Sequence, residues 1–326
     1  MLSLAGIAGG IAILILGGAM LVRGASDIAT RHNVSPIIVG LVIVGFGTSS
    51  PELVVNIIGA ATGASELAFG NAVGSNIANL GLILGVTVCL APITIQGSIV
   101  RRELPLLLLA TTMITVMALD GPLEGKPPVI GRSDSFVLLL VFTIFVYISI
   151  LDMIRVQSKD TLLTEIALHT DAVATATSRP PWLMVLAGFA LLYLGGEVTI
   201  RNSVRFAEII GISEAIVGLF VVSLGTSMPE MVTSVIAALR KESDLALGNI
   251  VGSNIFNSLV VLPVSGLIGK VNVPVGGVGD LVMSWLLAAI LIPVFFLGKG
   301  RLGRGMGTLF LVAYAAYAVI RLTQSP

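Results

Sequence analysis

Two six-residue stretches decide the fold of this 326-residue chain: GTSSPE at residues 47–52 and GTSMPE at residues 225–230. The offset of 178 between them also aligns residues 44–85 with residues 222–263 without a gap, with 21 identities in 42 positions. Further identities fall in GNAVGSNIAN at residues 70–79 and GNIVGSNIFN at residues 248–257. The chain therefore contains an internal repeat, and its two copies share polar motifs on consecutive segments.

The composition around these motifs is that of a membrane protein. Hydrophobic residues make up 56% of the chain, charged residues 11%, and the mean hydropathy is +1.04, whereas soluble domains carry about 25% charged residues. A helix needs about 20 apolar residues to cross a bilayer. We predict ten such spans, at residues 4–21, 36–61, 67–90, 104–119, 135–154, 182–200, 214–239, 245–268, 281–297 and 306–322.

The number of spans sets the orientation of the second copy. Five spans separate equivalent points of the repeat, and because five is odd, the second copy must cross the membrane in the opposite direction. We therefore expect an all-α membrane protein of ten transmembrane helices, arranged as two inverted five-helix repeats. Residues 1–155 would form the first repeat, 156–180 a cytoplasmic linker, and 181–326 the second, inverted repeat.

The loop charges predict the topology, since Lys and Arg favour cytoplasmic loops. With the N-terminus outside, 12 of the 18 Lys and Arg residues fall in inner loops, so we expect both termini outside. The small size and the lack of a large regulatory loop suit a prokaryotic plasma (inner) membrane. The formal net charge of zero gives no basic surface for nucleic acid. The expected partners are the lipid bilayer and inorganic cations, with no cofactor, and the chain is expected to act as a monomer.

The repeated motifs combine helix-breaking and oxygen-bearing residues. A proline inside a helix frees the carbonyl four residues earlier, which is Gly47 for Pro51. Hydroxyls three and four residues before each Glu share a helix face with its carboxylate, and the next helix of each half adds a Ser and an Asn at i, i+4. The predicted ion-facing side chains are Thr48, Ser49, Glu52, Ser75 and Asn79 in the first half and Thr226, Ser227, Glu230, Ser253 and Asn257 in the second.

These side chains are all oxygen donors, the set that Ca2+, Na+ and K+ prefer. The two histidines, His32 and His169, both fall in predicted loops. A pair of repeat-related carboxylates matches the charge of one divalent ion. An ionisable group at the bilayer centre costs about 2.5–3.5 kcal/mol on insertion scales, so Glu52 and Glu230 are better explained by function than by a structural hydrogen bond between helices.

The paired GTSxPE and GSNxxN motifs, one set in each half, resemble the two α-repeats of the sodium/calcium exchangers of the cation/calcium antiporter superfamily, and the resemblance covers nearly the whole chain. It implies a Na+/Ca2+ antiporter whose ions are bound by the side chains named above. It also implies backbone carbonyl ligands for Na+ at Gly45 and Ser223. Members of the family slide the first and sixth helices over the others, and Gly17 and Gly195 would permit such close contact.

One position departs from part of the family. Some members, including potassium-dependent exchangers, have Asp where this chain has Asn257. With Asn at both 79 and 257, the chain offers two carboxylates instead of three. K+ coupling is therefore not expected.

Three other functions compete with Na+/Ca2+ exchange. A cation/H+ exchanger could use the same carboxylates, although it would not need the flanking hydroxyl and carbonyl oxygens. An intramembrane enzyme would need a nucleophile with a His or Lys base, and no such base lies in the predicted spans. A non-transporting scaffold would not need polar residues repeated at equal spacing.

Overall fold

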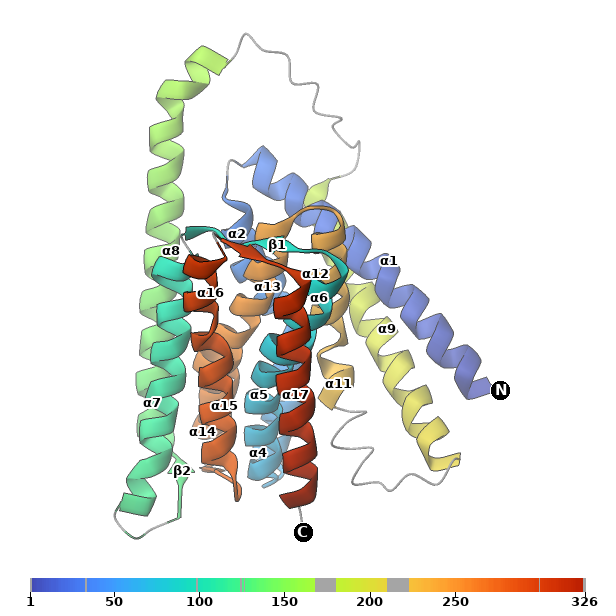
Figure 1. Cartoon of the computed structure of the whole chain (residues 1–326), viewed down its shortest axis with the longest axis vertical. Helices are drawn as coiled ribbons and strands as arrows, with labels where there is room; N and C mark the ends of the chain where they lie inside the picture. Colours follow the sequence, from blue (N-terminus) through green and yellow to red (C-terminus); the bar gives the residue numbers. More distant parts are fainter. Residues whose placement is uncertain are drawn as a thin grey trace.

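The computed structural model describes residues 2–32, 34–97, 99–123, 125, 127–167, 180–209, 223–298 and 300–324. Within these residues the chain is mostly helical, and its helices lie side by side (Figure 1). Both chain ends lie in the lower half of Figure 1. This is the arrangement expected if the two termini are on the same side of a membrane.

The first half contains helices joined end to end into longer segments, some of them with π-helical turns. Its elements are α1 (Leu2–Arg31), α2 (Pro36–Ile38), the π-helix η1 (Val39–Gly45), α3 (Phe46–Thr48), α4 (Ser50–Ala61), α5 (Ser65–Ala78), the π-helix η2 (Asn79–Ile83), α6 (Leu84–Leu90), β1 (Ile93–Thr94), the π-helix η3 (Ile99–Glu103), α7 (Leu104–Leu123), β2 (Val129–Ile130) and α8 (Arg132–Ala167).

The second half repeats this pattern. Its elements are α9 (Pro181–Ile209), α11 (Ser223–Thr226), α12 (Met228–Leu239), α13 (Ser243–Phe256), the π-helix η5 (Asn257–Val261), α14 (Leu262–Ile268), β3 (Val271–Asn272), α15 (Gly277–Ala289), α16 (Leu291–Leu297), β4 (Arg301–Leu302) and α17 (Arg304–Gln324). The bounds from α4 to β1 recur from α12 to β3 at the same offset of 178 as the sequence identities.

The two short sheets relate the halves to each other. Strand β1 pairs antiparallel with β4, and β2 pairs antiparallel with β3, so each sheet joins one strand from each half. Strand β1 lies at the upper end of the molecule in Figure 1, whereas β2, the partner of β3, lies at the lower end. Since β1 and β3 are equivalent in the repeat, their places at opposite ends fit two halves of opposite orientation.

The helices confirm a multi-pass membrane architecture. Among the described residues, seven helical segments are long and apolar enough to span a bilayer, or eight when the bent pair Pro36–Thr48 and Ser50–Ala61 is taken as one span. The predicted span 214–239 begins in residues 210–222, which lie outside the described residues. The predicted span 306–322 lies within the helix α17. The total of ten spans therefore stays a prediction.

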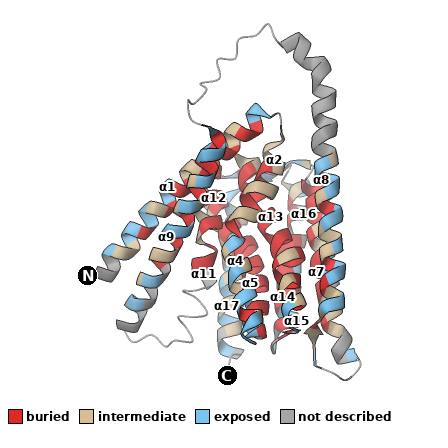
Figure 2. Ribbon diagram, turned by 180° about the vertical axis from the view of Figure 1, so that it is seen from behind, coloured by how far each residue is buried: buried red, intermediate tan, exposed pale blue. Residues whose placement is uncertain are grey.

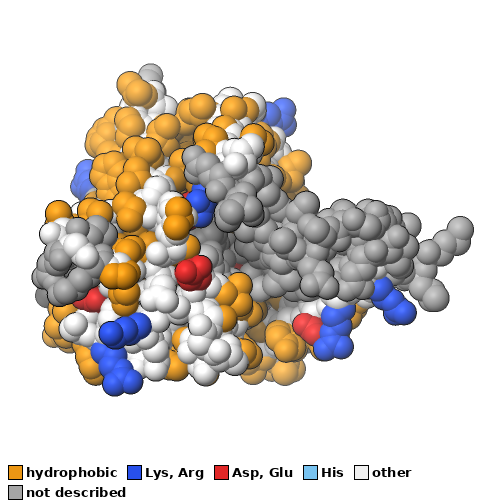
Figure 3. All heavy atoms as spheres, turned by 90° about the horizontal axis from the view of Figure 1, so that it is seen from below, with side chains coloured by type: hydrophobic (Ala, Val, Ile, Leu, Met, Phe, Trp, Pro, Cys, Tyr) orange, Lys and Arg blue, Asp and Glu red, His pale blue; other side chains and the backbone are white. Residues whose placement is uncertain are grey.

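Burial divides the helices into an inner and an outer set (Figure 2). The segment Ser243–Ile268 runs from α13 to α14, and 94% of its most apolar 18-residue stretch is buried inside the molecule. In Ser65–Leu90, 72% of the corresponding stretch is buried. In the outer helix α8 it is only 22%. In the coloured part of Figure 3, which views one end of the molecule, many side chains are hydrophobic and the charged side chains are scattered. The two segments that carry the GSNxxN motifs thus form the centre, and apolar outer helices face the surroundings.

Glycines set two close helix contacts. A Cβ at Gly17 of α1 would lie 2.8 Å from the backbone nitrogen of Leu192 in α9, and one at Gly195 of α9 would lie 2.8 Å from the nitrogen of Leu14. The close approach that these two glycines predict is therefore made between α1 and α9 themselves. A Cβ at Gly252 of α13 would lie 2.6 Å from the carbonyl oxygen of Leu41 in η1, so the two halves also meet backbone to backbone.

Candidate functional site

Each GTSxPE motif interrupts a helix. Helix α3 ends at Thr48 and α4 begins at Ser50, with a bend of 42° between the two segments. Ser49 has φ −83° and ψ 7°, and its equivalent Ser227, between α11 and α12, has φ −88° and ψ 6°. Pro51 and Pro229 fall in the first turn of the following helix, where a missing N–H breaks no intrahelical bond. The proline motifs therefore end one helix and begin the next.

The two predicted carboxylates are buried and joined to the opposite half. Glu52 and Glu230 are each 1% exposed. The hydroxyl of Ser49 donates to Oε1 of Glu230 at 2.9 Å, and the hydroxyl of Ser227 donates to Oε1 of Glu52 at 3.4 Å. Each carboxylate is thus bound by the motif of the other repeat, and the two halves share one polar centre.

The threonines follow the same crossed pattern. The hydroxyl of Thr48 lies close enough to Glu230, and that of Thr226 close enough to Glu52, to interact with the carboxylate. The spacing within a continuous helix predicts that Thr48 and Ser49 share a face with Glu52. The structure differs, because the helix is interrupted at Ser49 and the segment before it turns its hydroxyls toward the other half.

Asn71 and Asn249, which are not among the predicted ion-facing residues, hold the backbone of the two glutamates. The amide of Asn71 donates to the carbonyl oxygen of Glu52 at 3.3 Å, and the amide of Asn249 donates to that of Glu230 at 3.2 Å. Asn249 also accepts from the hydroxyl of Thr48 at 3.1 Å and donates to Ser234 at 2.8 Å. Their equal places in the GN pair of each second motif are the sequence signal for this role.

The predicted serine and carbonyl ligands adjoin this centre. The hydroxyl of Ser75 lies 3.4 Å from that of Ser227, which brings it beside Glu52. Ser253 donates to the carbonyl oxygen of Gly45 at 3.2 Å, and the hydroxyl of Thr48 lies 3.3 Å from the same oxygen. The carbonyl of Gly45 thus faces side chains of the centre. Ser223 is described only as the first residue of α11, and its side chain lies outside the described residues.

Asn79 and Asn257 are each the first residue of a π-helical turn, η2 and η5. Such turns frequently occur at functional sites. The amide of Asn79 donates to Oδ1 of Asn254 at 2.9 Å, and Asn254 in turn donates to the carbonyl oxygen of Asn76 at 3.2 Å. Neither polar atom of the Asn257 side chain has a hydrogen-bond partner among the described residues. The two halves are therefore not equivalent at this position.

Four buried oxygens of the candidate ligands have no donor among the described residues: Glu52 Oε2, Glu230 Oε2, Asn79 Oδ1 and Asn257 Oδ1. An unpaired buried carboxylate oxygen is costly unless it binds a proton or a cation. Carboxylate and amide oxygens are ligands for hard cations. The donor set that the structure brings together is therefore suited to Ca2+ or Na+.

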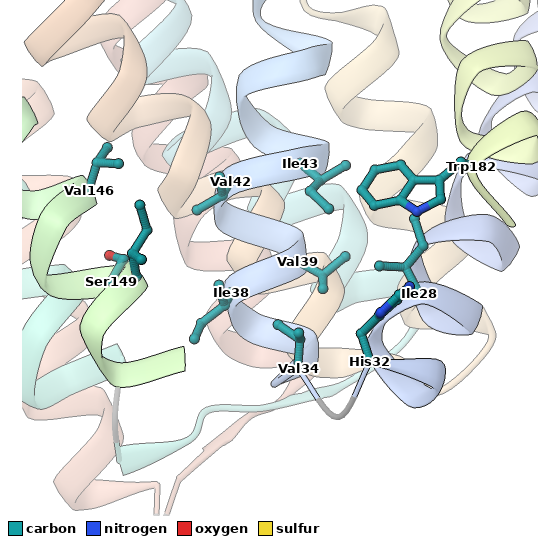
Figure 4. Close-up of a pocket in the computed structure, with 11 residues that line it drawn as sticks. Ile28, His32, Val34, Ile38, Val39, Val42, Ile43, Val146, Ser149 and Trp182 are labelled. Atoms are coloured by element: carbon teal, nitrogen blue, oxygen red, sulfur yellow. The ribbon is translucent and has the colours of Figure 1, made fainter. Parts of the chain in front are cut away.

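Two cavities lie near the inner helices. One of about 390 Å³ is lined by Thr48, Pro51 and Pro229 of the two motifs and by Phe189 and Tyr193 of α9, so it reaches the candidate centre. Another of about 390 Å³ lies between α1, η1, α8 and the start of α9 (Figure 4). Its walls are mainly apolar, and it contains none of the predicted site residues. Of these two cavities, the first is the one lined by predicted site residues.

The fold and this buried centre define a class: a multi-pass helical transporter of cations, built around helices that are interrupted at a shared polar centre. The profile of the family described as "Sodium/calcium exchanger protein" matches residues 2–151 and 180–323. The chain belongs to the sodium/calcium exchanger family and is an antiporter, not an enzyme.

Relatives cover nearly the whole chain. CaxA of Alkalimonas amylolytica is 36% identical over 94% of this chain and 95% of its own length, and the sodium/calcium exchanger MaX1 of Methanosarcina acetivorans is 28% identical over 95% and 96%. The solved structure of the sodium-calcium exchanger NCX_Mj soaked with zero Na+ and Ca2+ matches with a TM-score of 0.82, 25% identity and 98% of both chains covered. The fold of the chain is that of NCX_Mj.

Proposed function

We propose that the protein exchanges Ca2+ for Na+ across the membrane at one buried site shared by the two halves. Glu52 and Glu230 supply the charge that a divalent ion needs. The neutral ligands are the hydroxyls of Thr48, Ser49, Ser75, Thr226, Ser227 and Ser253, the amide oxygens of Asn79 and Asn257, and the carbonyls of Gly45 and Ser223.

One observation carries this proposal. Two carboxylates, each 1% exposed, accept hydrogen bonds from opposite repeats, and each keeps one oxygen without a donor among the described residues. Two negative charges in one apolar interior balance one Ca2+ or two Na+ ions. Alternate occupation of the same oxygens by the two ions is the chemical basis of exchange.

The helix packing supplies a route for alternating access. Helices α1 and α9 pack on each other through Gly17 and Gly195, and α9 contributes Phe189 and Tyr193 to the cavity that reaches the site. Movement of the α1 and α9 pair against the inner helices would open that cavity at one end and close it at the other. MaX1 and NCX_Mj are both named as exchangers of sodium and calcium, which agrees with this mechanism.

A second candidate function is Ca2+/H+ exchange on the same scaffold. Two unpaired carboxylate oxygens in an apolar interior could accept protons. The crossed hydroxyls and the Gly45 carbonyl favour Na+, because a proton needs no shell of neutral oxygen ligands.

The deciding experiment is 45Ca uptake into proteoliposomes with Na+, K+ or H+ gradients applied one at a time. An outward Na+ gradient should drive uptake, and K+ or H+ gradients should not. Uptake driven by the H+ gradient alone would establish the second candidate. If none of the three gradients drives 45Ca uptake, both candidates are refuted.

The proposed topology places the first repeat at residues 1–155, the linker at 156–180 and the second repeat at 181–326. Helix α8 continues to Ala167, past the predicted end of its span at residue 154, so part of the linker is helical. Both termini would lie outside the inner membrane of a prokaryote. Because the site is formed within one chain, a monomer would suffice for transport.

A further inference from the structure

The two GSNxxN motifs have the same sequence spacing but make different hydrogen bonds. In the first half, the amide of Asn79 donates to Oδ1 of Asn254 at 2.9 Å. At the repeat offset of 178, the equivalent hydrogen bond in the second half would run from the amide of Asn257 to Oδ1 of Asn76. That bond is not made, and both of its atoms are buried without a partner among the described residues. The repeat is therefore broken at one specific pair.

A serine present in only one half explains the break. The amide of Asn76 donates instead to the hydroxyl of Ser258 at 2.8 Å. The residue equivalent to Ser258 in the first half is Leu80, which has no acceptor. Ser258 thus engages the amide nitrogen of Asn76. Three polar atoms have no hydrogen-bond partner among the described residues: Asn76 Oδ1, Asn257 Oδ1 and Asn257 Nδ2.

A small enclosed cavity lies beside these atoms. Its volume is about 10 Å³, and its polar lining comes from Asn76, Thr111, Asn257, Ser258 and Ser284. All five side chains are buried, with exposures from 1% to 4%. A cavity of about this volume holds one water molecule.

We propose that this cavity is a binding site for a single ordered water that holds the side chain of Asn257 in the ion site. The water accepts a hydrogen bond from Nδ2 of Asn257 and donates one to Oδ1 of Asn76. Oδ1 of Asn257 is then directed to the transported ion. The water site stands on the geometry alone, whereas its effect on ions rests on the proposed function.

The unpaired atoms distinguish water from a cation. They comprise one N–H donor group and two acceptor oxygens. A water molecule can accept a hydrogen bond from the donor and donate hydrogen bonds to the acceptors. A monovalent cation would face the N–H group of Asn257, and the described residues that line the cavity include no carboxylate to balance its charge. Asn79 is held directly by Asn254, so the two sides of the ion site differ: one amide is fixed by protein and the other by water.

The first test is direct observation of the site in a crystal structure at a resolution where ordered waters are visible. A peak within hydrogen-bonding distance of Asn76 Oδ1 and Asn257 Nδ2 is expected. A direct hydrogen bond between these two side chains, with no density in the cavity, would overturn the proposal. So would an anomalous peak at this position after soaking with Tl+, since it would identify a cation site.

The second test uses two substitutions at Ser284, both of which remove its hydroxyl. Ser284→Val fills the cavity and should abolish the water peak, whereas Ser284→Ala leaves room and should keep it. Loss of one water-mediated hydrogen bond is expected to weaken apparent Ca2+ affinity about threefold to tenfold. Ser284→Val should therefore raise the Ca2+ concentration for half-maximal uptake by that factor relative to Ser284→Ala, with equal amounts of monodisperse protein.

The outcomes separate this inference from the proposed function. If the native protein shows the water but transports no Ca2+, the water site stands and the exchange proposal fails. If the native protein exchanges Ca2+ and the two Ser284 variants have the same apparent Ca2+ affinity, the positioning role of the water is refuted.

Discussion

The strongest single perturbation of the proposed site is Glu52→Gln. Glutamine keeps the volume of the side chain and can still accept the hydrogen bond that Ser227 makes to Oε1 at 3.4 Å. It replaces Oε2, which has no donor among the described residues, by an NH2 group that repels a cation. The change therefore deletes one of the two charges of the site with little change in packing.

The size of the effect follows from Coulomb's law. A carboxylate about 2.4 Å from Ca2+ attracts it by roughly 14 kcal/mol at an effective dielectric constant of about 20. Most of this attraction offsets the dehydration of the ion and the carboxylate. If only a fifth remains as net binding energy, its loss of about 2.8 kcal/mol weakens Ca2+ binding about 100-fold.

The assay is Na+-driven 45Ca uptake at matched protein density in proteoliposomes. Glu52→Gln and Glu230→Gln should each lose uptake almost completely at Ca2+ concentrations that half-saturate the native protein, because the crossed hydrogen bonds make the carboxylates equal partners. Glu66→Gln is the matched control, since Glu66 is exposed in the first turn of α5. Near-native uptake by either site variant, with the control unchanged, would refute the shared site.

Three further predictions use the same preparation. Thr48→Ala should raise the half-saturating Ca2+ concentration only about threefold to tenfold, since a hydroxyl is one neutral ligand and water can replace it; a complete loss would contradict this. Removal of K+ should leave exchange unchanged, because amides at both 79 and 257 add no charge for a monovalent ion, and a strict K+ requirement would show otherwise. With Cys89→Ser as background, a cysteine at Pro127 should react with a membrane-impermeant thiol reagent in intact cells and one at Pro180 should not; the reverse pattern would invert the topology.

The repeat and most of the helices could be predicted from the sequence, because identities at a constant offset and long apolar stretches are both visible in the order of the residues. The helix breaks at Ser49 and Ser227, two residues before each proline, agree with the preference of proline for the first turn of a helix. The equal spacing of the motifs predicts that the two carboxylates belong together. The structure brings Glu52 and Glu230 into one buried hydrogen-bonded centre, with Ser49 and Ser227 between them.

The crossed contacts could not be read from the sequence. Helical spacing predicts neighbours only while the helix continues. The interruption at Ser49 turns the hydroxyl of Ser49 itself toward Glu230 in the other half. The π-helical turns at Asn79 and Asn257 have no local sequence signature. The role of Asn249, which contacts Thr48, Ser234 and the backbone of Glu230 together, depends on the packing of three helices and is invisible in spacing alone.

The crossed arrangement also bears on why such a site would exchange ions instead of releasing them in one direction. Without a cation, the centre between the repeats holds two carboxylates in an apolar interior, and each keeps an oxygen without a donor among the described residues. Two unbalanced negative charges are costly in such an interior. Without a cation, it is therefore unfavourable for the protein to pass through a state in which the site is closed to both sides of the membrane. A bound Ca2+, or Na+ ions of equal charge, removes that cost. Because Ser49 and Ser227 tie each carboxylate to the opposite repeat, the neutralised site can close as one unit, and a return without cargo is disfavoured by the same charges that bind it.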